Sequence, residues 1–316
     1  MELQINLISI IIIAVIIDVI FGEFPAKIHP VVWMGKLIDI YNGNLIKYRN
    51  KISGIILTLD LVIIFTLATY VLTSLLAFNN LIYLIVSALI LTTTFAIKVL
   101  ITSAQDIRTE LDHDIGVARK SMSYLVSRDT SNLSKEDLIS ATIETLTENI
   151  TDSVIAPIFY AFIFGVPGAV AYRVINTLDA MVGYKNPENI KIGWFPANVD
   201  DILNYIPARL TGILVVIAAF ILRMNWKNAY KIMRRDARKP DSPNSGYSMA
   251  AAAGALEISL EKIGYYKIGD DLTNLTPDKI SEALLLTKTT ILLFIILIAL
   301  LFGLFIVLLM QLGYKI

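Results

Sequence analysis

The chain has 316 residues, of which 56% are hydrophobic and 17% are charged, and its mean hydropathy is +0.67. This composition excludes an ordinary soluble domain and indicates an integral membrane protein. The 27 basic and 27 acidic residues balance, so nothing suggests nucleic-acid binding, and the absence of cysteine excludes disulfides, thiolate nucleophiles and cysteine metal sites.

Long apolar runs predict membrane-spanning helices. They lie at residues 3–21, 52–77, 81–101, 154–171, 210–222 and 289–311. About 20 apolar residues cross a bilayer as a helix, and backbone groups in lipid need internal hydrogen bonds. We therefore expect an all-α fold, a polytopic membrane helix bundle with five or six spans, at least one of them broken or re-entrant, plus cytoplasmic helical loops. A single integral-membrane domain over residues 1–316 is the economical interpretation.

Charged residues gather between the apolar runs. Residues 22–52 hold five Lys or Arg and two acids, and residues 223–245 hold seven Lys or Arg and two acids. An excess of Lys and Arg marks cytoplasmic loops, so both segments are expected on the cytoplasmic side. Residues 102–152 instead carry ten acids and five bases.

Within the acidic region a helix is predicted from about Ser134, which suits the N-cap position with Asp137 three residues on. If this helix continues, Glu144, Glu148 and Asp152 lie at i, i+4 and i+8 and share one face. Such a stripe is either a solvated acidic face beside Lys or Arg from another segment, or a magnesium site. Hard oxygen ligands completed by substrate phosphates suit Mg²⁺.

A second polar strip lies at the end of the fourth apolar run. Arg173, Asn176 and Asp179 recur at i, i+3 and i+6 and would align on a helix. An Arg, an amide and a carboxylate can hold a phosphate and its metal together. The alternative is an Arg–Asp pair that satisfies a buried helix end.

Three further places hold candidate binding residues. In "SRDT", Arg128 is placed to meet an anion, although Asp129 can equally cap a turn. Arg235 and its basic neighbours precede the turn "PDSPNSG", and they either bind phosphates or keep this loop in the cytoplasm. His29 lies in "KIHPVVWMG", where a lone His more often makes a structural hydrogen bond than does chemistry.

Several stretches resemble one known family. They are "DVIFGEFPAKIHPVVWMGKLI" (18–38), "VSRDTSNLS" (126–134), "ETLTENITDSVIAPIFY" (144–160), "AYRVINTLDAMVGYKN" (171–186), "ANVDDILNYIPARLT" (197–211) and "RRDARKPDSPNSGYSMAAAAGALEI" (234–258). In this order, over nearly the whole chain, they resemble the membrane-bound adenosylcobinamide-phosphate synthase family of cobalamin biosynthesis. The chain departs from the family pattern at Glu23 and Phe24, and it matches less well after Leu260.

The resemblance implies a carbon–nitrogen ligase. Such an enzyme joins a propionate of adenosylcobyric acid to aminopropanol phosphate, or aminopropanol, and gives adenosylcobinamide phosphate or cobinamide. A carboxylate and an ammonium do not condense appreciably in water, so ATP and Mg²⁺ are expected as cofactors. The sequence contains no G-x-x-x-x-G-K-[ST] phosphate loop, so no motif locates the ATP site.

The resemblance, taken position by position, gives the expected site. The expected catalytic residues are Glu144, Glu148, Asp152 and Asp179, of which the first three are also the expected metal ligands. The expected substrate-binding residues are His29, Arg128, Asp129, Arg173, Asn176, Asp200, Arg209, Arg235, Asp236 and Asn244. The expected partners are adenosylcobyric acid, aminopropanol phosphate, ATP and the lipid bilayer, with no nucleic acid and with the oligomeric state left open. A multi-pass protein of the cell membrane with a cytoplasm-facing active site is expected.

Two other functions compete with this one. Asp18 and Asp60 inside apolar runs, and the interruptions at Pro157 and Gly165–Gly168, are also typical of transporters with broken helices. Polar residues concentrate beside the membrane runs, however, and the two halves show no inverted repeat. A non-catalytic membrane sensor of the same superfamily would lack the carboxylates, which this chain has.

The topology contains a conflict. With six simple spans, residues 173–203 would fall outside the cell and separate Asp179 from Glu148 by a bilayer. Because one reaction needs its groups within ångströms, we predict that residues 152–203 do not cross as one straight helix. The interruptions named above permit two half-helices. Glu148 and Asp179 are then expected to open on a common cytoplasm-facing cavity.

Overall fold

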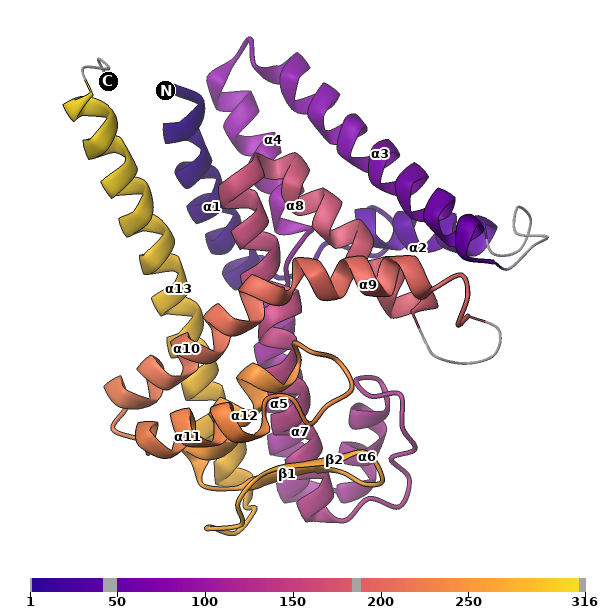
Figure 1. Cartoon of the computed structure of the whole chain (residues 1–316), viewed down its shortest axis with the longest axis vertical. Coiled ribbons are helices and arrows are strands. Elements are labelled where there is room, and N and C mark those ends of the chain that lie inside the picture. Colours follow the sequence, from indigo (N-terminus) through magenta and orange to yellow (C-terminus); the bar gives the residue numbers. More distant parts are fainter. Residues whose placement is uncertain (1, 42–49, 184–188, 313–316) are drawn as a thin grey trace. The chain divides into compact units, whose positions relative to one another are not determined.

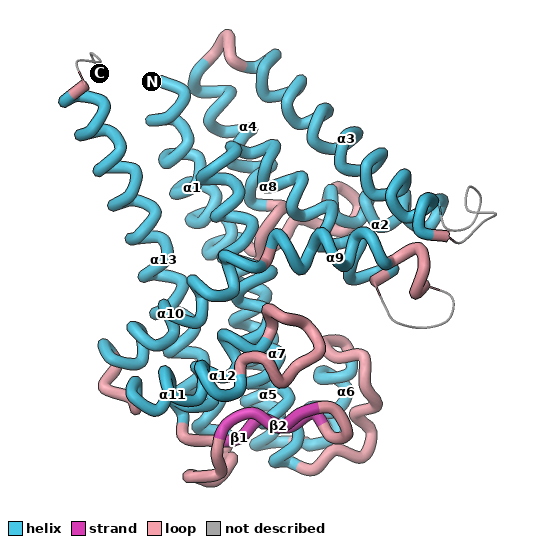
Figure 2. Tube along the Cα trace, in the orientation of Figure 1, coloured by secondary structure: helices cyan, strands magenta, loops and turns pink. Residues whose placement is uncertain are grey.

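The computed structural model describes residues 2–41, 50–183 and 189–312, and in these ranges it is helical almost throughout, as Figure 1 and Figure 2 show. The helices are α1 (Glu2–Phe21), α2 (Pro30–Ile40), α3 (Lys51–Leu76), α4 (Asn80–Thr92), α5 (Ile97–His113), α6 (Ile115–Ser123), α7 (Lys135–Ile150), α8 (Ala156–Val182), α9 (Trp194–Leu203), α10 (Tyr205–Ile221), α11 (Trp226–Asp236), α12 (Gly246–Leu256) and α13 (Pro277–Gln311). A π-helical turn, Thr151–Ile155, joins α7 to α8. One antiparallel hairpin, β1 (Ser259–Lys262) with β2 (Tyr266–Gly269), is the only sheet in the described ranges.

Four helical stretches are long and apolar enough to cross a membrane. They are Lys51–Leu76, Asn80–His113, Lys135–Val182 and Pro277–Leu308. Helices α9 and α10 form a fifth span if this pair, bent by 44°, is counted as one. The first apolar helix, at Asn6–Phe21, is shorter. The predicted all-α membrane fold with a broken span is therefore confirmed for the residues that the structure describes. The four or five stretches able to span reach the lower of the two predicted numbers, five or six, only if the bent pair counts as one span.

The chain packs into two compact units. The first unit contains Met1–Lys98, Ala156–Leu203 and Ala299–Ile316, and the second contains Val99–Ile155 and Asn204–Ile298. Each unit has a buried apolar core of its own. The interpretation of residues 1–316 as a single domain stays a prediction.

In the first unit, α8 packs against α2 and α3. The buried apolar side chains are Met34 and Ile38 from α2, Leu57 and Leu61 from α3, and Val170, Val174 and Leu178 from α8. Within each helix they recur every four residues, which places them on one face. This packing fixes the second half of α8, which carries the predicted strip of Arg173, Asn176 and Asp179.

Asp18 lies near the end of α1 and is fully buried. Its Oδ2 accepts the backbone N–H of Lys98 at 2.9 Å, at the start of α5, where the first N–H groups of a helix lack partners within it. The Lys98 ammonium in turn donates to the Ile20 carbonyl at 2.7 Å. The carboxylate therefore links two helix ends of the first unit, which accounts for an acid inside an apolar run.

Helix α8 is broken at Gly165, where φ is 71° and ψ is −171°. This backbone region is open mainly to glycine. Pro167 follows two residues later, and its ring has no N–H to donate to the preceding turn. The sequence predicted that residues 152–203 do not form one straight helix, and the break at Gly165 confirms this.

Replacing Gly165 with Ala is expected to destabilise the protein by about 1–3 kcal/mol. A Cβ at this position would meet Pro167 Cδ at 3.7 Å, an ordinary contact, so the cost comes from the backbone conformation and not from a clash. Thermal unfolding in detergent measures the effect. Gly303→Ala in α13 is the control, because open space surrounds that position and Ala favours a helix. Equal unfolding midpoints for the two variants would contradict the backbone argument.

In the second unit, α7 begins as predicted. Ser134 Oγ accepts the N–H of Asp137 at 3.0 Å, and Asp137 Oδ2 accepts the N–H of Ser134 at 3.1 Å. This reciprocal pair is a capping box, which satisfies two donors at the helix start. From Leu138 on most of this helix is buried, and Glu144 is among the buried polar residues.

Helix α12 is buried along its whole length, and Met249, Ala250 and Ala251 have no exposed surface. Small side chains let neighbouring backbones approach closely, and α12 packs against α10 and α11 (Figure 1). At Gly254 an added Cβ would clash with the backbone of Asn228, whose amide donates to the Gly254 carbonyl at 2.9 Å. Helix α12 therefore forms the central layer of the second unit.

Candidate functional site

Two carboxylates on successive turns of α7 form the centre of the candidate site in the second unit. Glu144 is only 4% exposed and Glu148 is half-buried. Nη2 of Arg128, from the loop before α7, lies 3.5 Å from Oε2 of Glu144. Arg128 Nε is buried without a hydrogen-bond partner. Glu144 is too buried to belong to a solvated acidic face. The Nε of Arg128 is a donor that remains for a ligand.

Contacts within its own segment hold the loop that carries Arg128. Nε and Nη2 of Arg119 donate to the Leu133 carbonyl at 3.0 and 2.8 Å. Oδ1 of Asp129 accepts the backbone N–H of Ser131 at 2.9 Å, and this hydrogen bond lowers the pKa of Asp129. The exposed Asp129 thus caps a turn, the simpler of its two predicted roles, and its binding role stays a prediction.

Asp152, the third carboxylate of the predicted stripe, lies in the π-helical turn. A π turn has a wider repeat than an α-helix, so the four-residue spacing that aligns Glu144 with Glu148 no longer applies there. Such turns occur frequently at functional sites. Among the described residues, no three His, Asp or Glu side chains come close enough together to hold a metal by themselves. The metal-ligand role of these carboxylates stays a prediction.

Sequence reasoning missed two residues beside the carboxylates, Lys262 and Tyr266 of the hairpin. The Tyr266 hydroxyl forms a hydrogen bond with Glu144, and the charge of Lys262 acts on both Glu144 and Glu148. The sequence did contain a signal for this hairpin. Apolar and polar residues alternate in "SLEK" and "YKIG", on either side of Gly264, whose φ is 81°.

The first unit assembles the polar strip of α8 with a residue of α9. Nη1 of Arg173 donates to Oδ1 of Asn176 at 3.3 Å, and the Asn176 amide donates to Oδ1 of Asp200 at 3.3 Å. Asp200 is 7% exposed, and Asp179, one turn after Asn176, is half-buried. The structure thus brings Arg173, Asn176 and Asp200 into one hydrogen-bonded chain. The predicted alignment of polar residues on α8 is present. The third residue of the hydrogen-bonded chain, Asp200, comes from α9.

His29 belongs to the same unit and caps α2. Its Nδ1 accepts the backbone N–H of Val31 at 3.3 Å, so this nitrogen carries no proton. Burial lowers the pKa of His29; the Glu23 carboxylate opposes this, and the Arg173 charge lowers the pKa further. His29 is therefore a neutral helix cap within reach of the charge of Arg173. Its predicted binding role stays a prediction.

Arg209 and Asn244 meet in the second unit, although 35 positions separate them in the sequence. Nη1 of Arg209 donates to Oδ1 of Asn244 at 3.1 Å. The guanidinium carbon lies 3.4 Å from the ring centroid of Tyr205 and 4.4 Å from that of Tyr247. Cation–π contacts with two rings hold the guanidinium plane in place. The binding roles of Arg209 and Asn244 stay predictions.

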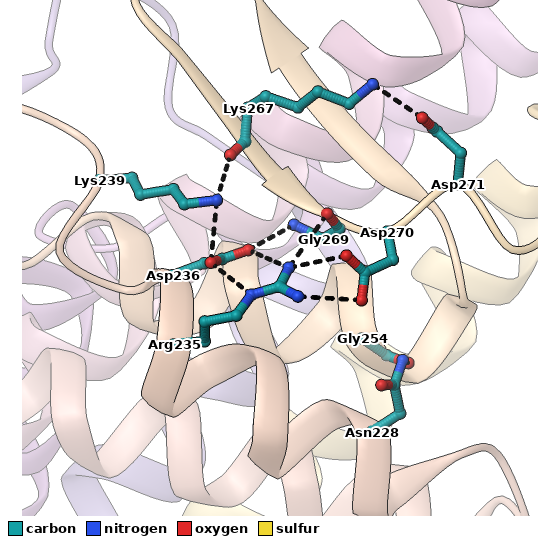
Figure 3. A network of polar contacts seen from close by, with 9 residues as sticks. All are labelled: Asn228, Arg235, Asp236, Lys239, Gly254, Lys267, Gly269, Asp270 and Asp271. Carbon is teal, nitrogen blue, oxygen red and sulfur yellow. Dashed lines mark hydrogen bonds and ion pairs between the residues drawn. The ribbon is translucent and has the colours of Figure 1, made fainter.

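Arg235 and Asp236 form the core of a network that Figure 3 shows. Nε and Nη2 of Arg235 donate to the two oxygens of Asp236 at 2.8 Å each, and Nη1 donates to Oδ2 of Asp270 at 3.1 Å. Asp236 is fully buried, and it also accepts the N–H of Gly269 at 2.8 Å and pairs with the Lys239 ammonium at 2.9 Å. The donors of this guanidinium are therefore engaged within the fold.

Burial raises the pKa of Asp236, but the hydrogen bonds from Arg235, Gly269 and Lys239 outweigh this and lower it to about 2. The carboxylate is charged at any physiological pH. These contacts tie the end of α11 to β2, which is a structural role. Contact of Arg235 or Asp236 with a substrate stays a prediction from the sequence.

The predicted residues therefore fall into separate groups. Arg128 with Glu144 and Glu148, Arg209 with Asn244, and Arg235 with Asp236 belong to the second unit, and His29, Arg173, Asn176, Asp179 and Asp200 belong to the first. The expected common cavity of Glu148 and Asp179 joins residues of different units and stays a prediction.

Comparison with known proteins identifies the family. The model of the CobD/Cbib protein family matches residues 11–291. The chain is 50% identical over 287 residues to a probable cobalamin biosynthesis protein CobD of Methanothermobacter thermautotrophicus, an alignment that covers 91% of this chain and 95% of the relative. It is 41% identical to the cobalamin biosynthesis protein CobD of Dehalococcoides mccartyi, over 89% of this chain and 92% of the relative.

A relative from Clostridium perfringens, also named cobalamin biosynthesis protein CobD, is 40% identical over 81% of this chain and 83% of its own length. No solved structure matches the chain. The family match covers most of the sequence, including the loop of Arg128, the carboxylates of α7 and the polar strip of α8. The chain therefore belongs to the CobD/Cbib family of cobalamin biosynthesis proteins.

Proposed function

We propose that the protein is an amide-forming ligase that joins a propionate carboxylate of adenosylcobyric acid to the amine of aminopropanol phosphate, or of aminopropanol, at the expense of ATP. The observation that carries this proposal is the pair Glu144 and Glu148 on successive turns of α7, of which Glu144 is buried and lies 3.5 Å from Arg128. A carboxylate held out of water suits the transfer of a proton from a reacting amine.

The chemistry is a two-step condensation. The propionate oxygen attacks the γ-phosphorus of ATP, ADP leaves, and an acyl phosphate forms. The neutral amine nitrogen then attacks the acyl carbon, the C–O bond to phosphate breaks, and the amide and inorganic phosphate result. The nitrogen loses one proton in this second step, and we assign its removal to Glu148, with Glu144 and Arg128 stabilising the charges around it.

Mg²⁺ is expected to accompany ATP. Glu144 and Glu148 provide hard carboxylate oxygens on adjacent helical turns, which is a donor type that Mg²⁺ prefers, and substrate phosphates commonly complete its ligands. The donor chemistry fits, so Glu144 and Glu148, together with Asp152, are the proposed ligands. A bound Mg²⁺ would neutralise phosphate charge during phosphoryl transfer.

The substrates' phosphates call for guanidinium groups. In the first unit we assign this role to Arg173, which Asn176 and Asp200 orient, and in the second to Arg128 and Arg209. We place the protein in the cell membrane with the active site facing the cytoplasm, where ATP is available. The excess of Lys and Arg in residues 223–245 supports this orientation.

An assay of the purified protein in detergent tests the proposal. Adenosylcobyric acid, ATP and Mg²⁺ are incubated with aminopropanol phosphate or with aminopropanol, and the corrinoid products are identified by mass spectrometry. The expected result is a corrinoid amide that forms only with ATP, with one ADP released per amide. Absence of amide with both amines, using protein that is folded and monodisperse, would overturn the proposal.

Replacing Arg173 with Lys is expected to raise the KM for aminopropanol phosphate or ATP by about tenfold to a hundredfold. Arg presents a rigid planar fork to a phosphate, whereas Lys presents a point charge. Steady-state kinetics with each substrate varied in turn measures the change. Lys191→Arg, which keeps a charge elsewhere in the first unit, is the control. An unchanged KM for every substrate would remove Arg173 from the phosphate site.

A further inference from the structure

The β1–β2 hairpin is docked along the carboxylate-bearing face of α7. The backbone N–H of Glu261 donates to Oγ of Ser140 at 3.1 Å, although 121 positions separate them in the sequence. Ser140, Glu144 and Glu148 lie at i, i+4 and i+8, so they share one face of the helix. The hairpin is thus anchored one turn before the first of the two carboxylates.

The strand register decides which hairpin side chains turn toward α7. Leu260 pairs with Ile268, and both are fully buried. Side chains two residues apart on a strand lie on the same face, as do directly paired residues. Lys262, which pairs with Tyr266, therefore continues the face of Leu260 and Ile268.

The opposite face of the hairpin behaves as an ordinary surface. Glu261 pairs with Lys267 in the register, both are exposed, and their charged atoms lie 3.8 Å apart. Lys267 also bonds to Asp271 at 2.7 Å. A lysine on the outer face is expected, whereas a lysine on the inner face, at Lys262, needs a reason.

Tyr266 has its polar tip at the carboxylates. Its hydroxyl forms a hydrogen bond with Glu144 and lies 3.9 Å from Sδ of Met249. A phenol hydroxyl at this position can orient the Glu144 carboxylate.

Lys262 supplies a positive charge that no carboxylate of the described residues neutralises in an ion pair. It is half-buried and makes no ion pair within the described part of the chain, and its ammonium lies 5.3 Å from the ring centroid of Tyr265. Its charge nevertheless acts on both Glu144 and Glu148. Arg128, on the same carboxylates, has a buried Nε without a partner. Near the two carboxylates of α7, Lys262 and Arg128 thus have hydrogen-bond donors without partners among the described residues. This arrangement suits a phosphoryl group and its metal.

We propose that the inner face of the hairpin forms part of the active site, with Lys262 and Arg128 binding the phosphoryl group that is transferred and Tyr266 positioning the Glu144 carboxylate. This proposal rests on the proposed function, since it names the phosphate subsite of the same reaction. It assigns roles to two residues in the part of the chain after Leu260, where the sequence resemblance is weaker.

Lys262→Gln tests the phosphate subsite. The KM for ATP and the Kd for a non-hydrolysable ATP analogue are both expected to rise by about tenfold to a hundredfold, the range for loss of one charged hydrogen bond. Lys262→Arg is expected to recover most of the binding. Lys267→Gln, the same change on the outer face, is the matched control and is expected to leave KM and Kd unchanged.

Tyr266→Phe tests the positioning role. It removes a single oxygen, and kcat is expected to fall by about tenfold with KM for ATP unchanged. Tyr265→Phe, one residue away and 74% exposed, is the matched control. Equal thermal midpoints for the two variants show that the fold is intact and that the change in kcat is not a loss of structure.

The outcomes separate this proposal from the function on which it rests. A wild-type protein that makes no amide overturns the proposed function, and the hairpin proposal falls with it. A wild-type protein that makes amide, together with Lys262→Gln and Tyr266→Phe variants that match their controls in KM, Kd and kcat, overturns the hairpin proposal alone.

Discussion

Replacing Glu148 with Gln is expected to lower kcat for amide formation by about 10²- to 10⁴-fold, the usual contribution of a general base. Gln has nearly the same shape but cannot accept the proton that the amine releases. The change also removes one proposed oxygen ligand of Mg²⁺. Single-turnover formation of the corrinoid amide, followed by mass spectrometry, measures the loss.

Glu136→Gln is the control for this variant. Glu136 lies in the first turn of the same helix and is exposed, so the same chemical change there is expected to leave turnover unaltered. Both proteins are expected to elute from a sizing column in detergent like the unaltered protein. A Glu148→Gln variant with normal turnover would remove both the base and the metal-ligand role from this residue.

Replacing Asp236 with Asn is expected to destabilise the protein by about 1–3 kcal/mol, because buried hydrogen bonds to the carboxylate are lost while the partly exposed Arg235 and Lys239 can still be solvated. The change leaves Arg235 and Lys239 without the carboxylate that neutralises them, and it leaves the Gly269 N–H with a weaker acceptor. Thermal unfolding in detergent, read by circular dichroism, measures the loss.

The matched control is Asp271→Asn on the surface of the same region. Its side chain is 64% exposed and pairs with Lys267 at 2.7 Å, and exposed pairs contribute about 0–1 kcal/mol. The unfolding midpoint of this variant is expected to stay near that of the unaltered protein. If both Asp variants melted together, the structural role given to the buried network would be wrong.

The Asp236 network also gives a dependence of stability on pH. The folded pKa of about 2 lies below the ordinary value of 3.8, so the folded state favours the charged carboxylate. The contribution is therefore fully present above the ordinary pKa and is lost as the pH falls through the folded one. The difference in unfolding midpoint between Asp236→Asn and the unaltered protein is expected to shrink as the pH is lowered over this range.

The parts of the fold that could be predicted depend on short-range patterns. The capping box of Ser134 and Asp137, the shared face of Glu144 and Glu148, and the break at Gly165 each depend on residues a few positions apart. Helical periodicity and capping act over the same distance. These features therefore appear in the sequence almost as they do in the structure.

The rest depends on contacts between distant segments. Asn176 meets Asp200 across 24 positions, and the hairpin meets Ser140 of α7 across 121. Only the packing of whole helices creates such contacts, and no local pattern encodes them. The π turn at Thr151–Ile155 was missed for another reason, because a wider helical repeat leaves the residue types unchanged and alters only their register.

The hairpin is fastened at both of its ends. Ser140 accepts a hydrogen bond from β1 at Glu261, and Asp236 accepts one from the end of β2 at Gly269. An isolated two-stranded hairpin is marginally stable in water, so this one owes its order to α7 and α11. Both hydrogen bonds would have to break before the hairpin could move away from these helices. The residues on its inner face are therefore set in place when the second unit folds.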